Sequence, residues 1–294
     1  MKHVIPFVLV SLLSTFNVYA FDDYTVKKDI PFKQLDDREL ALDLYLPNVE
    51  LGVESPLLVW VHGGAWKRGN KELLPEQNPL LLESVLTEGY AIAAVSYRLS
   101  GEASFPEPVQ DVNDAINYLS THAGEYGVKA DELIVMGRSA GAHLANLVGA
   151  TNEHQVDFLE QPKYRVKAVV SFFGPTDLLA LGNKGNRPTT ERASVSRFLG
   201  GIPSEIPEIA KAASPTHYIT ENSPPFIMLH GDLDKPVPLE QSELLKQVLD
   251  KYGVENQLFV EQGVGHSAPV FDTGKYVSEV VYYVKAYLPP QYEN

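Results

Sequence analysis

The chain has 294 residues, of which 44% are hydrophobic, and a formal net charge of −14 at pH 7. Its lysine and arginine residues are scattered without a basic run, which argues against binding to nucleic acids or to anionic membranes. The sequence has no cysteine, which excludes disulfides and cysteine metal sites. A chain of this length is able to bury a sizeable core.

Residues 1–20 have the pattern of a bacterial secretory signal peptide. Lys2 supplies a positive charge, residues 4–13 are almost wholly apolar, and Ala20 ends a suitable cleavage site. The apolar stretch is too short for a comfortable membrane span. We therefore expect an exported protein, periplasmic or extracellular, with no stable membrane insertion after cleavage. Residues 21–294 are expected to form a single domain.

Short apolar runs then alternate with longer amphipathic runs, which predicts a mostly parallel sheet covered by helices. The first forty residues after the signal peptide are expected to form edge strands that lead into the sheet. The other predicted strands span residues 41–46, 57–62, 90–97, 132–137, 166–173, 225–229 and 257–261. The predicted helices span residues 79–88, 106–125, 140–149, 238–252 and 275–288.

The first motif with chemical meaning is HGGAW at residues 62–66, directly after an early apolar strand. Two successive glycines let backbone NH groups turn toward a pocket, as in the HGGG-type loops that stabilise the oxyanion of acyl transfer. We expect the NH groups of Gly64 and Ala65 to be two of these oxyanion donors. His62 is interpreted as a brace of the loop, and Trp66 either lines the acyl pocket or packs the loop.

The most informative motif is the pentapeptide GRSAG at residues 137–141. It follows an apolar run and precedes a helix-like run, and strand, turn and helix together are the context of a nucleophile elbow. Glycines at both ends let the strand and the helix approach closely. We expect the turn to present the Ser139 hydroxyl as a nucleophile and the Ala140 NH as a third oxyanion donor. The pentapeptide by itself is a weak signal, because a Gly/Ser-rich connection in an ordinary α/β domain has the same pattern.

Residues 175–215 break the alternation of strands and helices, because they are rich in Gly, Pro, Thr, Asn and Ser. They lie between two predicted strands, and in an α/β sheet such a segment sits above the carboxyl ends of the strands. We interpret it as a small cap or loop excursion that shapes the substrate pocket. A plain surface loop is the alternative.

A serine nucleophile needs a base, and the base needs an acid that orients it. In this type of sheet the chain order is nucleophile, acid, histidine. Of the eight histidines, His266 lies downstream of every plausible acid, in a glycine-rich loop before the last predicted helix. We therefore expect His266 to be the base that acts on Ser139.

Two aspartates are candidates for the acid, because both follow the strand predicted over residues 225–229. We prefer Asp234, which lies further out in the loop and just before a proline-rich helix start. Asp232 is expected to hold the turn by accepting hydrogen bonds from nearby backbone NH groups. His230 is interpreted as a structural residue at the end of the strand.

With these four motifs in this order, the chain resembles the α/β-hydrolase superfamily. Within it, the chain is similar to the bacterial esterase/lipase group that includes hormone-sensitive-lipase-like and feruloyl- or acetylxylan-esterase-like enzymes. The resemblance covers nearly all of residues 40–288. It implies an α/β-hydrolase fold, with a mostly parallel eight-stranded sheet flanked by helices and a short cap. It also implies a triad of Ser139, His266 and Asp234, and neither a cofactor nor a metal.

The chain departs from this pattern in several respects, and one of them is Ala142, which follows Gly141 where a second glycine is common. Ala65 stands where a third glycine is common, which is closer to feruloyl-esterase-like and kynurenine-formamidase-like members. The cap is short, which argues against large lipid substrates with interfacial activation.

The expected function is hydrolysis of short-chain or aromatic acyl esters through an acyl-enzyme. The substrate is expected to be a small molecule or an ester linked to a polysaccharide. One alternative is an amide hydrolase, such as an arylformamidase or a peptidase, that uses the same triad. The other is a non-catalytic binding protein on a hydrolase scaffold, although such proteins usually lack a triad member.

Overall fold

The structure is a computed structural model that describes residues 24–50, 52–183, 190–266 and 269–290. The predicted signal peptide lies outside the described residues. The strands are β1 (Tyr24–Gln34), β2 (Glu39–Pro47), β3 (Ser55–Val61), β4 (Ala91–Val95), β5 (Val128–Arg138), β6 (Arg165–Phe172), β7 (Phe226–Gly231) and β8 (Asn256–Glu261). The helices are α1 (Leu73–Gln77), α2 (Pro79–Thr87), α3 (Glu107–Tyr126), α4 (Ala140–Thr151), α5 (Leu178–Asn183), α6 (Thr190–Leu199), α7 (Pro207–Ala212), α8 (Glu240–Tyr252) and α9 (Gly274–Tyr287), with 3-10 turns η1 (Pro215–His217) and η2 (Pro269–Asp272).

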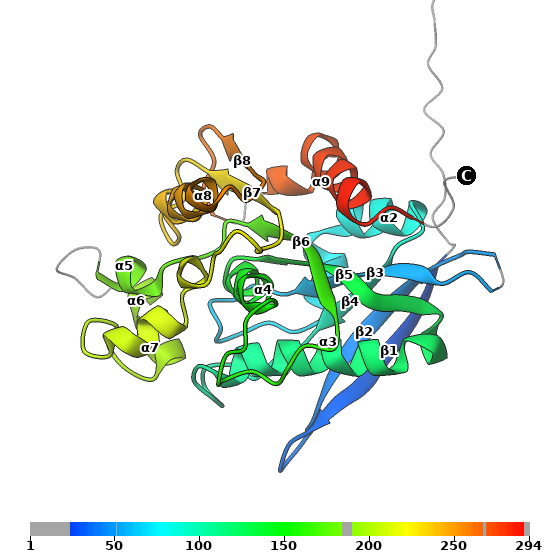
Figure 1. The fold of residues 1–294 in the computed structure, drawn as a ribbon, viewed down its shortest axis with the longest axis horizontal. Coiled ribbons are helices and arrows are strands. Elements are labelled where there is room, and N and C mark those ends of the chain that lie inside the picture. The colour runs from blue at the N-terminus through cyan, green and yellow to red at the C-terminus, as the bar shows by residue number, and fades with distance from the viewer. Residues whose placement is uncertain (1–23, 51, 184–189, 267–268, 291–294) are drawn as a thin grey trace, which may run out of the picture.

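The strands form one sheet in the order β1-β2-β4-β3-β5-β6-β7-β8 (Figure 1). Strand β2 is antiparallel to both of its neighbours, and every pairing from β4 to β8 is parallel. The prediction of a mostly parallel eight-stranded sheet is therefore confirmed. The segment after residue 23 forms β1 at the edge of the sheet, as expected.

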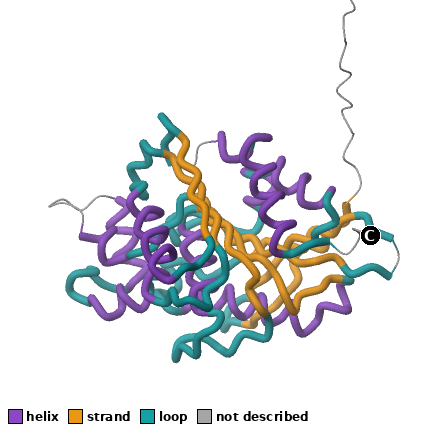
Figure 2. The backbone as a smooth tube through the Cα atoms, turned by 45° about the horizontal axis from the view of Figure 1, so that its top comes forward, coloured by secondary structure: helices purple, strands orange, loops and turns teal. Residues whose placement is uncertain are grey.

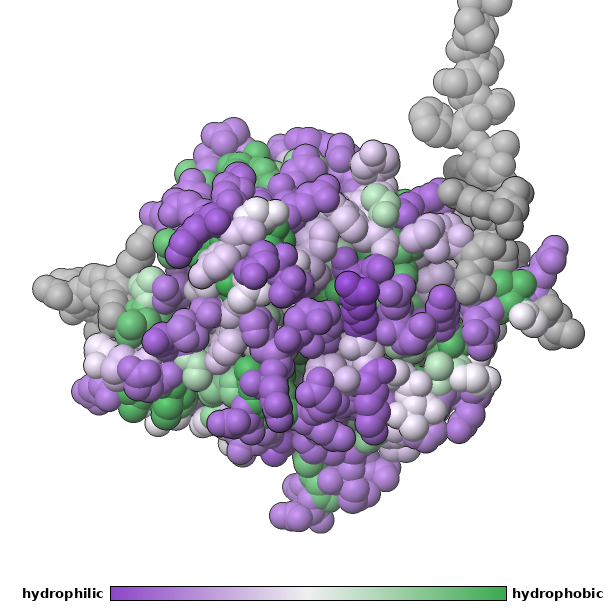
Figure 3. Space-filling view, viewed as in Figure 1, coloured by the Kyte–Doolittle hydropathy of each residue, from purple (hydrophilic) through white to green (hydrophobic). Residues whose placement is uncertain are grey.

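Helices cover both faces of the twisted sheet (Figure 2). Successive strand residues point to opposite faces, so Leu57 and Val59 join one buried apolar cluster whereas Leu58 and Trp60 join the other. Helices α3, α4 and α8 contribute to the first cluster, and α2 and α9 contribute to the second. Strands β3 and β4 are buried along their whole length, which explains their continuous apolar sequences. The face of the molecule in Figure 3 is mostly hydrophilic.

The structure corrects two details of the sequence-based prediction. Strand β5 begins at Val128, four residues before the predicted start, because Val128 and Lys129 pair with the beginning of β3 ahead of a register shift. The charged residues that follow conceal this pairing in the sequence. Residues 175–215 are more regular than their composition indicates, since they contain the short helices α5, α6 and α7.

The order of the strands determines where a site is expected. From β3 the chain crosses through α1 and α2 to β4 on one side, and it returns through α3 to β5 on the other side of β3. The loops after β3 and β5 therefore diverge at a topological switch point, where open α/β sheets bind their ligands. Helices α5 to α7 lie between β6 and β7 in the chain and extend to the left in Figure 1. No helix within the described ranges is long and apolar enough to cross a membrane.

Candidate active site

Ser139 lies in a strained turn between β5 and α4. Its backbone has φ of 52° and ψ of −119°, and its NH donates a hydrogen bond of 2.9 Å to the carbonyl of Phe172. The glycines of the pentapeptide are sterically required. A Cβ on Gly141 would lie 2.1 Å from the carbonyl oxygen of Val61, and one on Gly137 would lie 2.6 Å from the backbone of Gly141.

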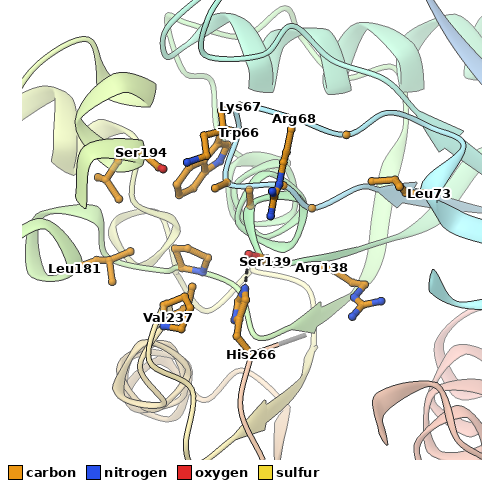
Figure 4. Close-up of a pocket in the computed structure, with 18 of the residues that line it drawn as sticks. Trp66, Lys67, Arg68, Leu73, Arg138, Ser139, Leu181, Ser194, Val237 and His266 are labelled. Carbon is orange, nitrogen blue, oxygen red and sulfur yellow. Dashed lines mark hydrogen bonds between the residues drawn. The ribbon is translucent and has the colours of Figure 1, made fainter. Parts of the chain in front are cut away.

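The structure brings Ser139, His266 and Asp234 together. Figure 4 shows the hydrogen bond between Ser139 and His266. Nε2 of His266 lies 2.8 Å from Oγ of Ser139, and Nδ1 lies 2.6 Å from Oδ2 of Asp234. An ionised carboxylate only accepts hydrogen bonds, so Nδ1 of His266 carries the proton. In this tautomer Nε2 is the acceptor and faces the hydroxyl of Ser139. The geometry therefore suits proton transfer from Ser139 to His266.

The carboxylate of Asp234 is held in a buried network. Its side chain has no exposed surface, and its Oδ1 accepts a hydrogen bond of 2.9 Å from the NH of Val237. Burial on its own raises the pKa of Asp234. Hydrogen bonds from His230 and His266 outweigh this effect and hold the pKa of Asp234 below its usual value. Asp234 is therefore ionised at neutral pH.

His230 is buried at the end of β7 and has a partner on each side of its ring. Its Nε2 donates to the carbonyl of Val237 at 2.8 Å and lies 3.3 Å from Asp234 Oδ2. Its Nδ1 accepts a bond of 2.7 Å from the hydroxyl of Ser242. The structural interpretation of His230 is thus extended, because the ring also contacts the candidate acid.

Asp232, the other candidate acid, holds the turn as predicted. Its Oδ1 accepts hydrogen bonds from the backbone NH groups of Gly263 at 2.6 Å and Val264 at 3.3 Å. The NH of Leu233 donates back to the carbonyl of Val264. These bonds join the loop that carries Asp234 to the loop that carries His266.

The loop after β3, which borders the cavity beside Ser139, has unusual backbone angles. The φ angles of Gly64, Ala65 and Trp66 are 124°, 53° and 56°. Gly64, Ala65 and Ala140, the three predicted oxyanion donors, line the same cavity as Ser139. Among the described residues, none of their backbone NH groups has a hydrogen-bond acceptor. These NH groups are free to bind an oxygen atom of a ligand.

The side chain of His62 braces this loop through contacts with Tyr97 and Gly63. Its ring is buried and stacks on Tyr97 at 4.3 Å between centroids, and its Nδ1 donates to the carbonyl of Gly63 at 2.8 Å. Burial lowers the pKa of His62 to about 4. The neutral ring is therefore part of the scaffold of the loop.

Trp66 both lines the cavity and packs the loop, the two alternatives that the sequence left open. It lines the cavity, yet only 3% of its surface is exposed, and it stacks on Phe198 of α6 at 4.7 Å between centroids. Its Nε1 donates to Nδ1 of His143 at 3.2 Å, and Nε2 of His143 donates to the carbonyl of Ala213 at 2.7 Å. His143 thus connects the loop to the end of the cap. This role of His143 is not predicted above, although a histidine within an apolar helix indicates that the ring has a polar partner.

The cavity beside Ser139 has a volume of about 620 Å³. Cap residues Leu181 and Ser194 lie on one side of Ser139, whereas Leu73 and Arg138 lie on the other (Figure 4). Where the structure is described, no cluster of three or more histidine or carboxylate side chains could hold a metal ion.

Arg138, the second residue of the pentapeptide, is buried against the loop that precedes α2. Its Nη1 donates to Oδ1 of Asn78 at 2.9 Å and to the carbonyl of Gln77 at 3.2 Å. Its guanidinium also lies over the ring of Phe173. Burial lowers the pKa of Arg138 below its usual value, and these contacts fix its side chain away from Ser139.

The chain matches the BD-FAE family model over residues 42–249. It is 28% identical over 246 residues to Esterase LipC of Mycobacterium tuberculosis, covering 81% of this chain and 59% of LipC. It is 31% identical to Esterase LipQ of the same organism, covering 82% of this chain and 56% of LipQ. The chain thus spans a little over half the length of these curated relatives.

Among solved structures, the chain is similar to a truncated form of a carbohydrate esterase from gut microbiota. The TM-score is 0.78 at 27% identity, and the match covers 91% of this chain and 98% of the other. An esterase from the Planctomycetes species Thermogutta terrifontis matches with a TM-score of 0.72 at 23% identity, over 93% of this chain and 95% of the other, which supports the fold. The family match and the fold together show that the chain belongs to the BD-FAE family of α/β-hydrolases.

Proposed function

We propose that the protein is a serine carboxylesterase that acts through an acyl-enzyme. The observation that carries this proposal is the position of His266, which is hydrogen-bonded to Ser139 on one side and to buried Asp234 on the other. The esterase names of the curated relatives support the same reaction.

In the first step, His266 Nε2 accepts the proton of Ser139 while Oγ bonds to the carbonyl carbon of the ester. The carbonyl oxygen becomes negatively charged, and the free NH groups of Gly64, Ala65 and Ala140 are placed to stabilise it. The bond to the alcohol oxygen then breaks, and His266 delivers the proton to the departing alcohol.

In the second step, a water molecule takes the place of the alcohol. His266 accepts a proton from this water as the water oxygen attacks the acyl carbon. The second tetrahedral intermediate then collapses: the bond between the acyl carbon and Ser139 Oγ breaks, His266 returns the proton to Oγ, and the acid is released. Asp234 keeps the proton on Nδ1 and stabilises the transient imidazolium in both steps.

The proposed substrates are short-chain or aromatic acyl esters, either on small molecules or on polysaccharides. The cavity volume of about 620 Å³ is typical of small-molecule sites. The likeness to a carbohydrate esterase supports a polysaccharide-linked ester. The proposal includes export of the protein, which rests on residues 1–20.

The test is hydrolysis of para-nitrophenyl esters, from acetate to decanoate, together with a feruloyl ester. The wild type and Ser139→Ala are measured side by side, with circular dichroism as the control for folding. We expect turnover of the shorter esters by the wild type and a loss of at least about 1,000-fold in Ser139→Ala. Turnover that Ser139→Ala retains, or no ester turnover by folded wild type, would overturn the proposal.

A further inference from the structure

The charged side chains around the cavity all have the same sign. They are Lys67, Arg68 and Arg138, and the described lining residues include no aspartate or glutamate. The whole chain has the opposite balance, with 38 acidic and 24 basic side chains. The rim of this cavity is therefore a local concentration of positive charge on an acidic protein.

Arg68 differs from Arg138 in having no hydrogen-bond or ion-pair partner among the residues that the structure describes. Arg138 is fixed by Asn78, Gln77 and Phe173, as described above. Arg68 is exposed, and its guanidinium forms no hydrogen bond or ion pair with any residue in the described ranges. Its five NH groups are thus available to a ligand.

The backbone of the loop directs Arg68 toward the candidate nucleophile. The stem of Arg68 packs over Gly64, since a Cβ on that glycine would lie 3.1 Å from Arg68 Cγ. In Figure 4 the side chain extends from the loop into the cavity in the direction of Ser139. Arg68 therefore lines the same cavity as the free NH groups of the loop.

We propose that Arg68 is a specificity-determining residue that binds a carboxylate carried by the substrate near the scissile ester. This inference rests on the proposed esterase function. A guanidinium binds a carboxylate through two parallel hydrogen bonds, and the apolar walls of the cavity strengthen this attraction. The preferred substrates are then esters whose acyl group or alcohol is itself an acid.

Two pairs of esters test the proposal, one for each side of the scissile bond. On the acyl side, the charged ester is para-nitrophenyl hydrogen adipate, whose acyl chain ends in a carboxylate. Its neutral partner is the same para-nitrophenyl ester with a methyl ketone at the end of the chain, so that CH3 replaces the charged oxygen. On the alcohol side, para-acetoxybenzoate is compared with para-acetoxybenzamide. The measured quantity is the ratio of kcat/KM for the charged ester to that for its neutral partner, in the wild type, Arg68→Gln and Lys235→Gln.

Lys235→Gln is the matched control, because it removes one exposed positive charge next to the site from a side chain that is not among the described lining residues. We expect the wild-type ratio to exceed one in one of the pairs. Arg68→Gln should lower that ratio by about fivefold or more, and added salt should lower it in the wild type. Lys235→Gln should change it by less than about twofold.

Three results would overturn the proposal. The first is a wild-type ratio of one or less in both pairs, and the second is an equal fall of the ratio in both variants. The third is an equal fall of kcat/KM for the charged and the neutral ester in Arg68→Gln. Such a fall would mean that the arginine acts on the oxyanion that both esters form. If the folded wild type hydrolyses neither the charged nor the neutral esters, the esterase function itself fails, and this outcome is distinct from the other three.

Discussion

The indole Nε1 of Trp66 donates a hydrogen bond of 3.2 Å to Nδ1 of His143, and Nε2 of His143 donates to the carbonyl of Ala213. One buried imidazole thus joins three parts of the site: the loop after β3, the helix after Ser139 and the end of the cap. This arrangement requires a neutral ring, because one nitrogen must accept while the other donates.

Removal of the imidazole should destabilise the protein as well as the site. His143→Leu leaves the indole NH and the Ala213 carbonyl buried without partners, so we expect a loss of about 3 kcal/mol in the free energy of unfolding. Urea denaturation measures this loss. In the double variant with Trp66→Phe, part of the loss should be recovered, because one of the orphaned groups is absent. Stability equal to the wild type would contradict the assigned contact.

The stability of the protein should fall in mild acid. Burial lowers the pKa of His62 and of His143 to about 4, from 6.5 for an unperturbed histidine. Between these pH values the unfolded chain binds more protons than the folded chain. The stability that the two neutral rings contribute is therefore complete above about pH 6.5 and is lost toward pH 4. Between pH 7.5 and pH 5, each histidine should lower the free energy of unfolding by about 2 kcal/mol.

The comparison of His143→Gln with the wild type isolates the contribution of one histidine. Urea denaturation at the two pH values should show that the variant loses about 2 kcal/mol less than the wild type over this interval. Parallel stability profiles would mean that His143 titrates in the same way in the folded and unfolded chains.

Asp234 and Asp232 are both candidates for the acid by sequence, and replacement of each by asparagine should affect kcat very differently. Asp234→Asn should lower kcat by about 1,000-fold or more, because an amide stabilises neither the proton on His266 Nδ1 nor the imidazolium. Asp232→Asn keeps an oxygen that accepts from the Gly263 NH, so its loss should stay below about tenfold. Steady-state kinetics on one para-nitrophenyl ester decides between them. Equal losses would argue against Asp234 as the acid.

The glycine at the end of the pentapeptide should not tolerate a methyl group. In Gly141→Ala the Cβ would lie 2.1 Å from the Val61 carbonyl, so the variant should unfold at much lower urea concentration or fail to fold. Gly124→Ala is the matched control, since a Cβ there meets nothing within 4 Å in helix α3. This control should be more stable than the wild type by about 0.5–1 kcal/mol. Similar effects of the two changes would contradict the close packing at the turn.

The parts of the site that were predictable from sequence are those determined by local backbone chemistry. The pentapeptide around Ser139 and the paired glycines at Gly63 and Gly64 are turns that few other residues permit, and the apolar runs before them indicate the strands. The chain order of the motifs then selected His266. The contact of Asp234 with this histidine agrees with its position further out in the loop.

The features that the sequence did not reveal depend on contacts between distant segments. Trp66 and His143 are 77 residues apart, and no periodicity indicates that they meet. The cap helices have polar sequences that resemble loops, and their stability derives from packing on residues such as Trp66. The direction of Arg68 depends on the backbone path over Gly64, which only the structure shows.

In the proposed mechanism Ser139 Oγ is the atom that attacks the ester. The measurement that addresses this atom is the intact mass of the folded protein after incubation with a para-nitrophenyl alkylphosphonate, followed by peptide mapping. We predict the addition of one phosphonyl group, on Ser139, at a rate that falls strongly in Asp234→Asn and to zero in Ser139→Ala. A folded protein that hydrolyses esters but is labelled on another residue, or on none, would contradict the account.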